Sequence, residues 1–260
     1  MCAMTRSPSA KLDFDLRAEE YARHRKVHPG VAEAFIASGL VGSGSRVLDV
    51  GCGTGNYAVV LTAASNCRIS GIDPSANMLD RARDAVPWES LSQGSAEILP
   101  FPGGSFDVVM TTDVIHHIQD RTAYFREAAR VLRSGGHIVT VTDSRDDIPR
   151  RRPLSSHFPE TVDVELRRYP PVPLLLRELA DGGFDELRLS HVEHAYELAD
   201  IQPYRDRAFS SLHLIDEGAF RRGIKRLEGD LASGPISCIS LYTIICGMKP
   251  GETPNCGIRR

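Results

Sequence analysis

A stretch of eleven residues, Val47 to Tyr57 (VLDVGCGTGNY), constrains the fold more than any other part of the chain. An apolar run ends in an acid, and glycine then stands at the alternate positions Gly51, Gly53 and Gly55. Glycine allows a positive φ and lets the backbone approach a neighbour closely. The run SRVLDV predicts a buried strand and NYAVVLTAA predicts a helix, so the glycines form a strand-to-helix turn.

Strand-like and helix-like patterns alternate after this turn. CRISGID, ESLSQG, SFDVVMTTD and HIVTVTD predict four further strands. PSANMLDRARDA predicts a helix with Pro74 at its start, and RTAYFREAARVLRSGG predicts one that ends at a glycine C-cap. Alternation of this kind indicates βαβ units and a mainly parallel, doubly wound sheet. Right-handed crossovers then place the ends of the strands, and their ligand-binding loops, on one edge.

The alternation stops after Asp143. Residues 144–171 have no clear period, VPLLLRELADGGF predicts a helix, and DELRLSHVEHAYEL and PISCISLYTIICGMK predict two closing strands around a second excursion at about 197–235. We therefore expect disordered tails at 1–10 and 249–260 and a single domain at 11–248. This domain divides into N-terminal cap helices at 11–42, a cofactor core at 43–143 and two inserts at 144–171 and 197–235 that cover the substrate.

Composition excludes some classes of protein. Apolar residues make up 42% and charged residues 25% of the 260 residues, as in soluble globular proteins, and the net charge of −3 lacks the basic footprint of a nucleic-acid binder. No apolar run approaches the roughly 20 residues that span a bilayer. Residues 1–10 contain no apolar signal-peptide core, so we expect a cytoplasmic protein. The six cysteines show no spacing that suits zinc.

The spacing of the glycines narrows the choice of ligand. The pattern is GxGxG, whereas the dinucleotide fingerprint is GxGxxG. Asp73 follows about 20 residues later at the end of the next predicted strand, where an acid accepts hydrogen bonds from both hydroxyls of a ribose. The glycines would let backbone N–H groups and the following helix N-terminus approach this ligand. These features favour a nucleoside, and no Walker lysine follows; a tight turn without a ligand is the alternative.

Taken together, the motifs VLDVGCGTG, GIDPSANML, QGSAEILPF, FDVVMTTDVIHHI and LRSGGHIVTVTD resemble the class I S-adenosylmethionine-dependent methyltransferases, specifically the type 11 group that acts on small molecules. The resemblance is close over about 45–145. It implies a Rossmann-like methyltransferase fold, an α/β doubly wound seven-stranded sheet, mostly parallel with the last strand antiparallel, carrying helical inserts. It also implies S-adenosyl-L-methionine as cofactor and S-adenosyl-L-homocysteine as product.

The resemblance assigns roles to individual residues. Asp73 is the ribose acid, Met78 packs on adenine, the backbone near Ala96 meets the base, and Tyr21 of the N-terminal helix borders the methyl group. An ordinary amphipathic cap helix is the alternative for the segment around Tyr21. The full cofactor set is Tyr21, Asp49, Gly51, Cys52, Gly53, Asp73, Pro74, Met78, Ser95, Ala96, Glu97 and Thr112.

The sequence departs from the family pattern at Ser95, where the group usually has an aspartate that accepts a hydrogen bond from the adenine amino group. Serine accepts this bond without a charge. We therefore expect a lower cofactor affinity unless Glu97 contributes.

Methyl transfer needs alignment and a dry site, and a base only if the acceptor must lose a proton. The segment TTDVIHHIQD supplies Asp113, His116 and His117, and histidine titrates near the working pH. His117 and His116 are the candidate catalytic residues. The alternative is that one histidine packs on the sheet and the other caps the region of Gln119–Arg121. Adjacent residues on a turn point apart and no third ligand is evident, so no metal is expected.

Five residues are candidates for contact with the substrate: Arg25, His28, Tyr204, Phe209 and His213. Aromatic residues in an insert usually shape an apolar pocket, although packing onto the sheet explains them nearly as well. For the basic run at 150–152 (RRR), a solvated mixed-charge loop is favoured over an anion site, because acids surround it.

We predict a methyltransferase that acts on a small organic molecule in secondary or specialised metabolism, as a monomer or homodimer without nucleic-acid or membrane partners. The alternatives are a protein of this fold that runs other chemistry, a macromolecule methyltransferase and a non-catalytic sensor. The sequence does not name the acceptor atom.

Overall fold

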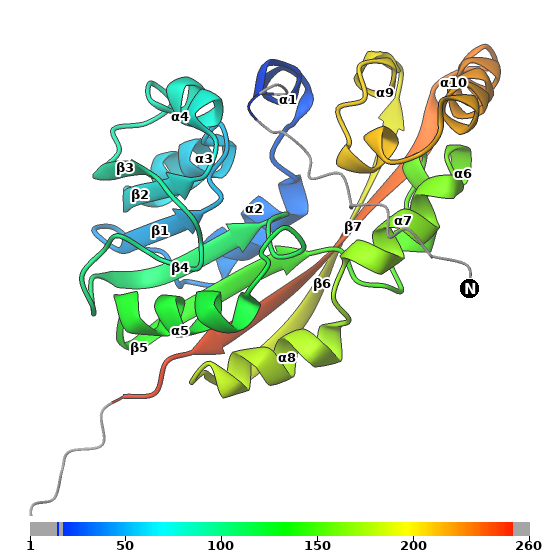
Figure 1. Ribbon diagram of the computed structural model, residues 1–260. Helices are drawn as coiled ribbons and strands as arrows, with labels where there is room; N and C mark the ends of the chain where they lie inside the picture. Colours follow the sequence, from blue (N-terminus) through cyan, green and yellow to red (C-terminus); the bar gives the residue numbers. More distant parts are fainter. Residues whose placement is uncertain (1–14, 16–17, 252–260) are drawn as a thin grey trace, which may run out of the picture.

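The computed structural model describes residue 15 and residues 18–251, so the predicted tail 1–10 and most of the predicted tail 249–260 lie outside the described residues. The strands are β1 (Arg46–Val50), β2 (Arg68–Asp73), β3 (Ser90–Gln93), β4 (Phe106–Thr112), β5 (Leu132–Thr142), β6 (Asp185–Leu198) and β7 (Ile236–Met248). In the described chain they form one seven-stranded sheet in the order β3-β2-β1-β4-β5-β7-β6. Strand β7 runs antiparallel to both of its neighbours, and the remaining pairs are parallel (Figure 1). This confirms the predicted Rossmann-like sheet.

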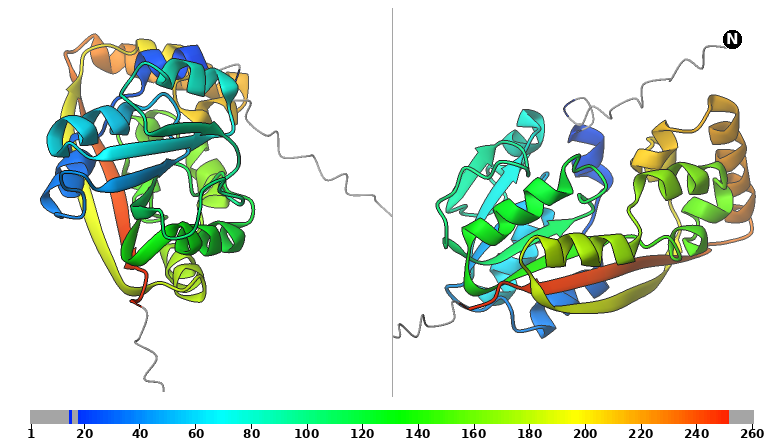
Figure 2. Two further views of the ribbon diagram at one scale, coloured as in Figure 1. Left: turned by 90° about the vertical axis from the view of Figure 1, so that its left-hand side faces the viewer. Right: turned by 60° about the horizontal axis from the view of Figure 1, so that its bottom comes forward.

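Helices cover both faces of the sheet. The helices are α1 (Ala18–His24), α2 (Pro29–Ala37), α3 (Asn56–Ser65), α4 (Ala76–Ala82), α5 (Arg121–Val131), α6 (Leu154–His157), α7 (Glu160–Arg168), α8 (Val172–Asp181), α9 (Gln202–Arg205) and α10 (Glu217–Leu231), with 3₁₀ turns η1 (Ile148–Arg150) and η2 (Ser210–His213). Helices α2 and α3 lie on one face of the sheet, and α5 and α8 lie on the other (Figure 2). A hydrophobic core lies under each of these two pairs. Successive residues of β1 pack into the two cores alternately, as expected for a strand buried on both faces. Val47 packs into the core under α2 and α3, and Leu48 packs into the core under α5 and α8.

Two predicted helix boundaries are wrong. Helix α5 ends at Val131 rather than at the glycine pair, because Leu132 is extended, fully buried and already paired with Phe106 of β4. The N–H of Gly135 donates to the carbonyl of Lys249, so this glycine lies in an irregular part of β5 and does not cap α5. Pro74 lies outside α4, whose N-cap is Ser75.

The two inserts pack against each other. We call α6, α7, α9, η2 and α10, together with the ends of β6 and β7 beside them, the outer lobe. Its own hydrophobic core joins the first insert to the second, and consists of Leu154, Phe158, Ile201, Tyr204, Leu212, Phe220, Leu227, Ile236 and Cys238. In Figure 1, β6 and β7 run on from the main sheet to these helices, and α1 lies between α4 and α9. Helix α1 and the outer lobe thus lie on the side of the sheet to which the carboxyl ends of β1 and β4 point (Figure 1).

Candidate active site

The glycine loop joins β1 to α3, and all three of its glycines have a positive φ. A Cβ on Gly51 would lie 2.4 Å from the Val114 side chain, and one on Gly55 would lie 3.0 Å from Trp88. A Cβ on Gly53 would meet Tyr21 at 3.6 Å, an ordinary contact distance. Two of the glycines are therefore required by packing within the protein, whereas Gly53 borders Tyr21.

Most of the loop's N–H groups are used within the protein, contrary to the prediction that they point at a ligand. The N–H groups of Gly51 and Cys52 both donate to the carbonyl of Ile72, at 2.7 and 3.2 Å. The N–H of Gly55 donates to the carbonyl of Cys52. A phosphate cradle needs several free N–H groups, so this loop is not built as one.

Asp73 connects the end of β2 to the glycine loop. Its Oδ2 accepts the N–H of Gly53 and its Oδ1 accepts the N–H of Ser75, each at 2.9 Å. The carboxyl group is buried, and burial raises its pKa although the two backbone N–H groups act to lower it. Each oxygen retains a lone pair, so the carboxylate can still accept hydrogen bonds from a diol.

Asp49 is a second buried carboxyl group, at the carboxyl end of β1. It is 3% exposed and has no hydrogen-bond partner among the described residues. Burial, with a smaller contribution from the charge of Asp73, raises its pKa to about 7. An unpaired buried carboxylate is costly unless a cation neutralises it, so this group fits the positively charged amino acid end of a ligand.

Ser95 and Glu97 form a polar pair beyond the end of β3. The hydroxyl of Ser95 donates to Glu97 Oε2, while Glu97 Oε1 accepts the N–H groups of Gln119 and Asp120. Burial acts to raise the pKa of Glu97, but hydrogen bonds from Ser95 and from these backbone groups lower it overall. Ser95 is exposed and thus accessible, with its hydroxyl polarised by a carboxylate, which partly replaces the charge of the usual aspartate.

The remaining members of the predicted cofactor set lie in different surroundings. Cys52 and Met78 are buried, whereas Ala96 is partly buried and packs against the α5 side of the core. Pro74 is exposed. Thr112, at the end of β4, has a buried Oγ1 with no partner among the described residues.

Arg25 and Asp113 join the N-terminal segment to the sheet. Arg25 Nη2 donates to Asp113 Oδ2 at 2.5 Å, and the hydroxyl of Tyr242 from β7 donates to the same oxygen at 2.5 Å. The side chains of Arg25 and Asp113 are 24% and 15% exposed. The guanidinium also lies 5.7 Å from the ring centre of Tyr21 and 5.8 Å from that of Phe209. A predicted substrate residue therefore connects α1, β4, β7 and the outer lobe.

The two histidines after β4 lie against each other and are uncharged at neutral pH. The ring of His116 lies 3.9 Å from that of Tyr169 and 4.0 Å from that of His117. Burial lowers the pKa of His117 to about 4, assisted by the positive charge of Arg168, and burial lowers that of His116 well below its ordinary range. The N-cap of α5 is Asp120, whose Oδ1 accepts the N–H of Ala123.

The basic run after β5 is not a fully solvated loop. Arg150 and Arg152 are exposed, but Arg151 is only 9% exposed. Its Nη1 donates to Asp143 at 2.8 Å and its Nη2 donates to Glu165. Burial raises the pKa of Asp143 to about 6 although Arg151 opposes the shift. The solvated loop predicted for this run is therefore wrong at Arg151. The three consecutive arginines alternate in direction, and the middle one points inward.

Two predicted substrate residues are held by contacts within the protein. His28 is the N-cap of α2, since its Nδ1 accepts the N–H of Val31 at 3.3 Å, and it is 8% exposed. Tyr204 is 2% exposed in the core of the outer lobe, where its ring stacks on Phe158 and packs against Phe209. Both side chains are buried, so neither faces an open surface in this structure.

Phe209 and His213 are more accessible to a substrate than His28 and Tyr204 are. Phe209 is partly buried and faces the Arg25 guanidinium. His213 is partly buried at the end of η2. Helix α1 also reaches this lobe directly, because His24 Nε2 lies 2.7 Å from Asp206 Oδ2. These contacts bring the N-terminal segment and the second insert together over the site.

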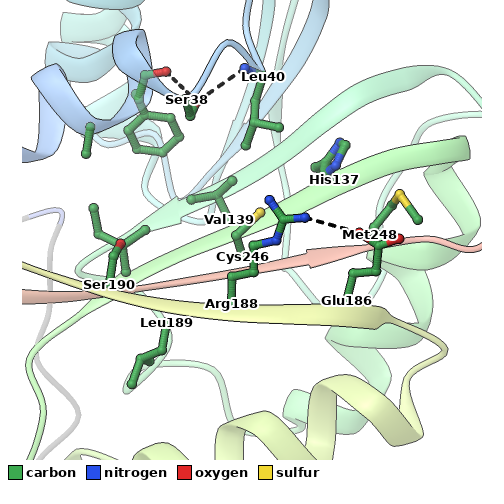
Figure 3. Close-up of a pocket in the computed structure, with 13 residues that line it drawn as sticks. Ser38, Leu40, His137, Val139, Glu186, Arg188, Leu189, Ser190, Cys246 and Met248 are labelled. Atoms are coloured by element: carbon green, nitrogen blue, oxygen red, sulfur yellow. Dashed lines mark hydrogen bonds and ion pairs between the residues drawn. The ribbon is translucent and has the colours of Figure 1, made fainter.

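A groove of about 370 Å³ lies elsewhere, on the sheet face formed by β5, β7 and β6 beside α2 (Figure 3). Its lining includes Phe35, Val139 and Cys246, and none of the predicted site residues. Arg188 contributes to it and forms an ion pair with Glu186. Within residue 15 and residues 18–251, no group of three or more His, Cys, Asp or Glu side chains could hold a metal ion, and no helix is long and apolar enough to cross a membrane.

The sequence did not single out Tyr169, Arg168 or Tyr242, although all three lie among the predicted site residues. Tyr169 and Arg168 end α7 in a segment without a readable period, and Tyr242 lies in an apolar strand where an aromatic residue predicts packing. The fold alone brings them to the carboxyl edge.

Comparison with known proteins agrees with this geometry. Residues 48–140 match the family model described as a methyltransferase domain. The chain is 37% identical over 103 residues to 27-O-demethylrifamycin SV methyltransferase of Amycolatopsis mediterranei, covering 37% of this chain and 38% of that protein. It is 27% identical over 191 residues to the Probable S-adenosylmethionine-dependent methyltransferase Rv3030 of Mycobacterium tuberculosis, covering 73% of this chain and 64% of that protein. The matches thus span less than two thirds of either relative.

A solved structure shares the fold. A protein of Anabaena variabilis superimposes with a TM-score of 0.67 at 24% identity, covering 84% of this chain and 96% of that one. Residues 48–140, which match the family model, contain the glycine loop, Asp73 and the Ser95–Glu97 pair. The cofactor of the family is S-adenosyl-L-methionine, as the motifs predicted. Residues 48–140 thus form a methyltransferase domain, similar to those of S-adenosylmethionine-dependent methyltransferases.

Proposed function

We propose that this chain transfers a methyl group from S-adenosyl-L-methionine to a small organic acceptor. The observation that carries the proposal is the arrangement of Asp49 and Asp73 beside the glycine loop. One buried carboxyl group has no partner among the described residues, and the other holds the loop while retaining lone pairs. This arrangement suits a ligand with a cationic end and a ribose.

The residues fit each part of the cofactor. Asp49 would pair with the ammonium group of the methionine end. Asp73 would accept hydrogen bonds from the ribose hydroxyls, and the Ser95–Glu97 pair would accept one from the adenine amino group. The bound cofactor supplies a methyl group on a positively charged sulfur, for which the neutral thioether is a good leaving group. The chain's own task is then to align the acceptor and to exclude water.

Contacts around Arg25 support this second task. They hold α1 against the end of β4 and against Phe209 of the outer lobe, on the side of the glycine loop where Tyr21 lies. Tyr21 therefore remains our candidate for the side chain nearest the methyl group. Burial raises the pKa of Tyr21, so its hydroxyl stays protonated and can act as a hydrogen-bond donor.

The acceptor is a small molecule in this proposal, with a role in secondary or specialised metabolism. Support comes from the name of the rifamycin relative and from a formal net charge of −3, which does not favour nucleic acid as the substrate.

Incubation with methyl-labelled S-adenosyl-L-methionine and a panel of phenols, aromatic acids, amines and thiols tests the proposal. Label should appear in at least one acceptor and should be lost in Asp73→Ala. Calorimetric binding of the cofactor without transfer to any acceptor would instead favour a protein of this fold that runs other chemistry.

A further inference from the structure

Arg168 is a partly buried arginine at the end of α7, close to the histidine pair. Its Nη1 donates to the hydroxyl of Ser210 in η2 at 3.2 Å, so it bridges the two inserts. Burial lowers its pKa, as expected when a charged group is removed from water. Among the described residues no carboxylate lies within ion-pair distance of Arg168, whereas Arg25 and Arg151 each contact at least one.

The surroundings of Arg168 are aromatic. Its neighbour in the chain, Tyr169, stacks on His116, which in turn lies against His117. His116 Nδ1 is buried and has no hydrogen-bond partner among the described residues. Flat rings, an unpaired imidazole nitrogen and a positive charge therefore meet at the edge of the sheet where the acceptor must lie.

We propose that Arg168 binds the methyl acceptor as an oxyanion, so that the substrates of this chain are planar acidic compounds such as phenols, enols or aromatic carboxylic acids. This inference rests on the proposed function and names its substrate class. Guanidinium pairs with planar oxyanions through parallel hydrogen bonds, and the pair is strong where water is excluded.

This role also resolves how the acceptor loses its proton. A base whose conjugate acid has a pKa near 4, as His117 has, removes a proton from an ordinary phenol poorly. A nearby fixed positive charge stabilises the bound phenolate, so the site binds the acceptor in its ionised form and the proton goes to solvent. Arg168 then selects the ionised form.

4-Nitrophenol tests the inference because its phenolate absorbs visible light and its neutral form does not. Titration of the probe bound to the protein with S-adenosyl-L-homocysteine gives its pKa in the site. We expect the wild-type protein to lower this pKa by about one unit or more, which corresponds to roughly 1.4 kcal/mol of preferential phenolate binding. Arg168→Met should abolish the shift, and Arg168→Lys should restore part of it.

Two matched variants separate charge from structure. Arg167 is exposed on the same helix, so Arg167→Met should keep the wild-type shift. Ser210→Ala removes the hydrogen bond between the inserts but keeps the guanidinium, and it should also keep the shift. Thermal melting of each variant with S-adenosyl-L-homocysteine checks folding.

The inference is overturned if wild-type protein leaves the pKa of 4-nitrophenol unchanged or does not bind it, or if Arg168→Met behaves as Arg167→Met does. A loss of the shift in Ser210→Ala equal to that in Arg168→Met would identify Arg168 as a structural strut and also overturn it. Methyl transfer to neutral amines or thiols, at equal rates in wild type and Arg168→Met, would sustain the proposed function while refuting this substrate class.

Discussion

Asp73 combines two roles at the scale of a single residue, since it anchors the glycine loop and keeps acceptor capacity for a ribose. Asp73→Ala should weaken binding of S-adenosyl-L-homocysteine by about tenfold or more, because hydrogen bonds to a charged group contribute roughly 1.5–3 kcal/mol. Calorimetry measures the affinity. Asp80→Ala is the matched control, because Asp80 is exposed on α4 and pairs only with the exposed Arg83 in the described structure. Equal affinities for the two variants would refute the ribose assignment.

The pH dependence of cofactor binding follows from Asp49. Its pKa in the folded protein, about 7, is above the unfolded value near 3.9, so protonated Asp49 favours the fold at low pH and this contribution is lost as pH rises through about 7. The ammonium group of a ligand has the opposite preference and binds the ionised form of Asp49. Affinity for S-adenosyl-L-homocysteine should therefore rise between pH 5.5 and 7.5 and then level off.

Calorimetry over this range with Asp49→Asn provides the test. The variant cannot ionise, so its affinity should be lower at pH 7.5 and should change much less with pH. The same rise in affinity in the variant would assign the pH dependence to another group.

His117 is the candidate base, and its low pKa sets the expected size of its effect. General bases contribute about 10²- to 10⁴-fold when their pKa is near the working pH, so His117→Ala should reduce turnover by less than about tenfold at pH 7–8. Cofactor affinity should not change. A loss of two orders of magnitude in kcat, without a change in the melting temperature, would show that the histidine is a base after all.

Side-chain roles were predictable where one motif fixes both position and chemistry. Asp73 and the glycines follow from the spacing of a strand, a turn and the next strand. Arg151 and Tyr204 were misjudged because burial is decided by contacts with distant segments: Glu165 lies 14 residues beyond Arg151, and Phe158 lies 46 residues before Tyr204. No local pattern contains that information.

At the scale of secondary structure, α10 shows how a glycine in a helix can be required by packing. A Cβ on Gly223 would lie 2.1 Å from the ring of Phe158, whereas one on Gly229 would meet nothing within 4 Å. Gly223→Ala should destabilise the protein by about 1–3 kcal/mol through overpacking, and Gly229→Ala should stabilise it by up to about 1 kcal/mol through helix propensity. Urea unfolding compares the two variants, and similar stabilities would show that Phe158 moves aside.

Strands and long helices were predicted well because hydrophobic period and length agree in them. The outer lobe was not, because its helices α6 and α9 have four residues each and are stabilised by the shared core rather than by their own sequence. That the two inserts form one unit is a property of tertiary packing alone.

At the scale of the whole molecule, His24 and Asp206 connect α1 to the outer lobe across the site. His24→Ala should speed hydrogen exchange of the α1 amides severalfold and leave the melting temperature nearly unchanged, because a single part-exposed contact contributes little to global stability. Arg23→Ala is the control, since Arg23 pairs with Glu19 inside the same helix. Equal exchange in both variants would show that the contact does not hold α1 in place.

The position of β7 has a consequence for how the chain is made. Strand β6 pairs with β7 on one side and is an edge strand on the other, and β7 in turn separates it from β5. During synthesis β6 therefore leaves the ribosome about 40 residues before its partner β7. The free edge of β5, which also pairs with β7, remains unpaired for longer still. Until the last strand of the sheet is complete, two unpaired strand edges are available to other chains, so assembly of this protein is most vulnerable to aggregation at its final step.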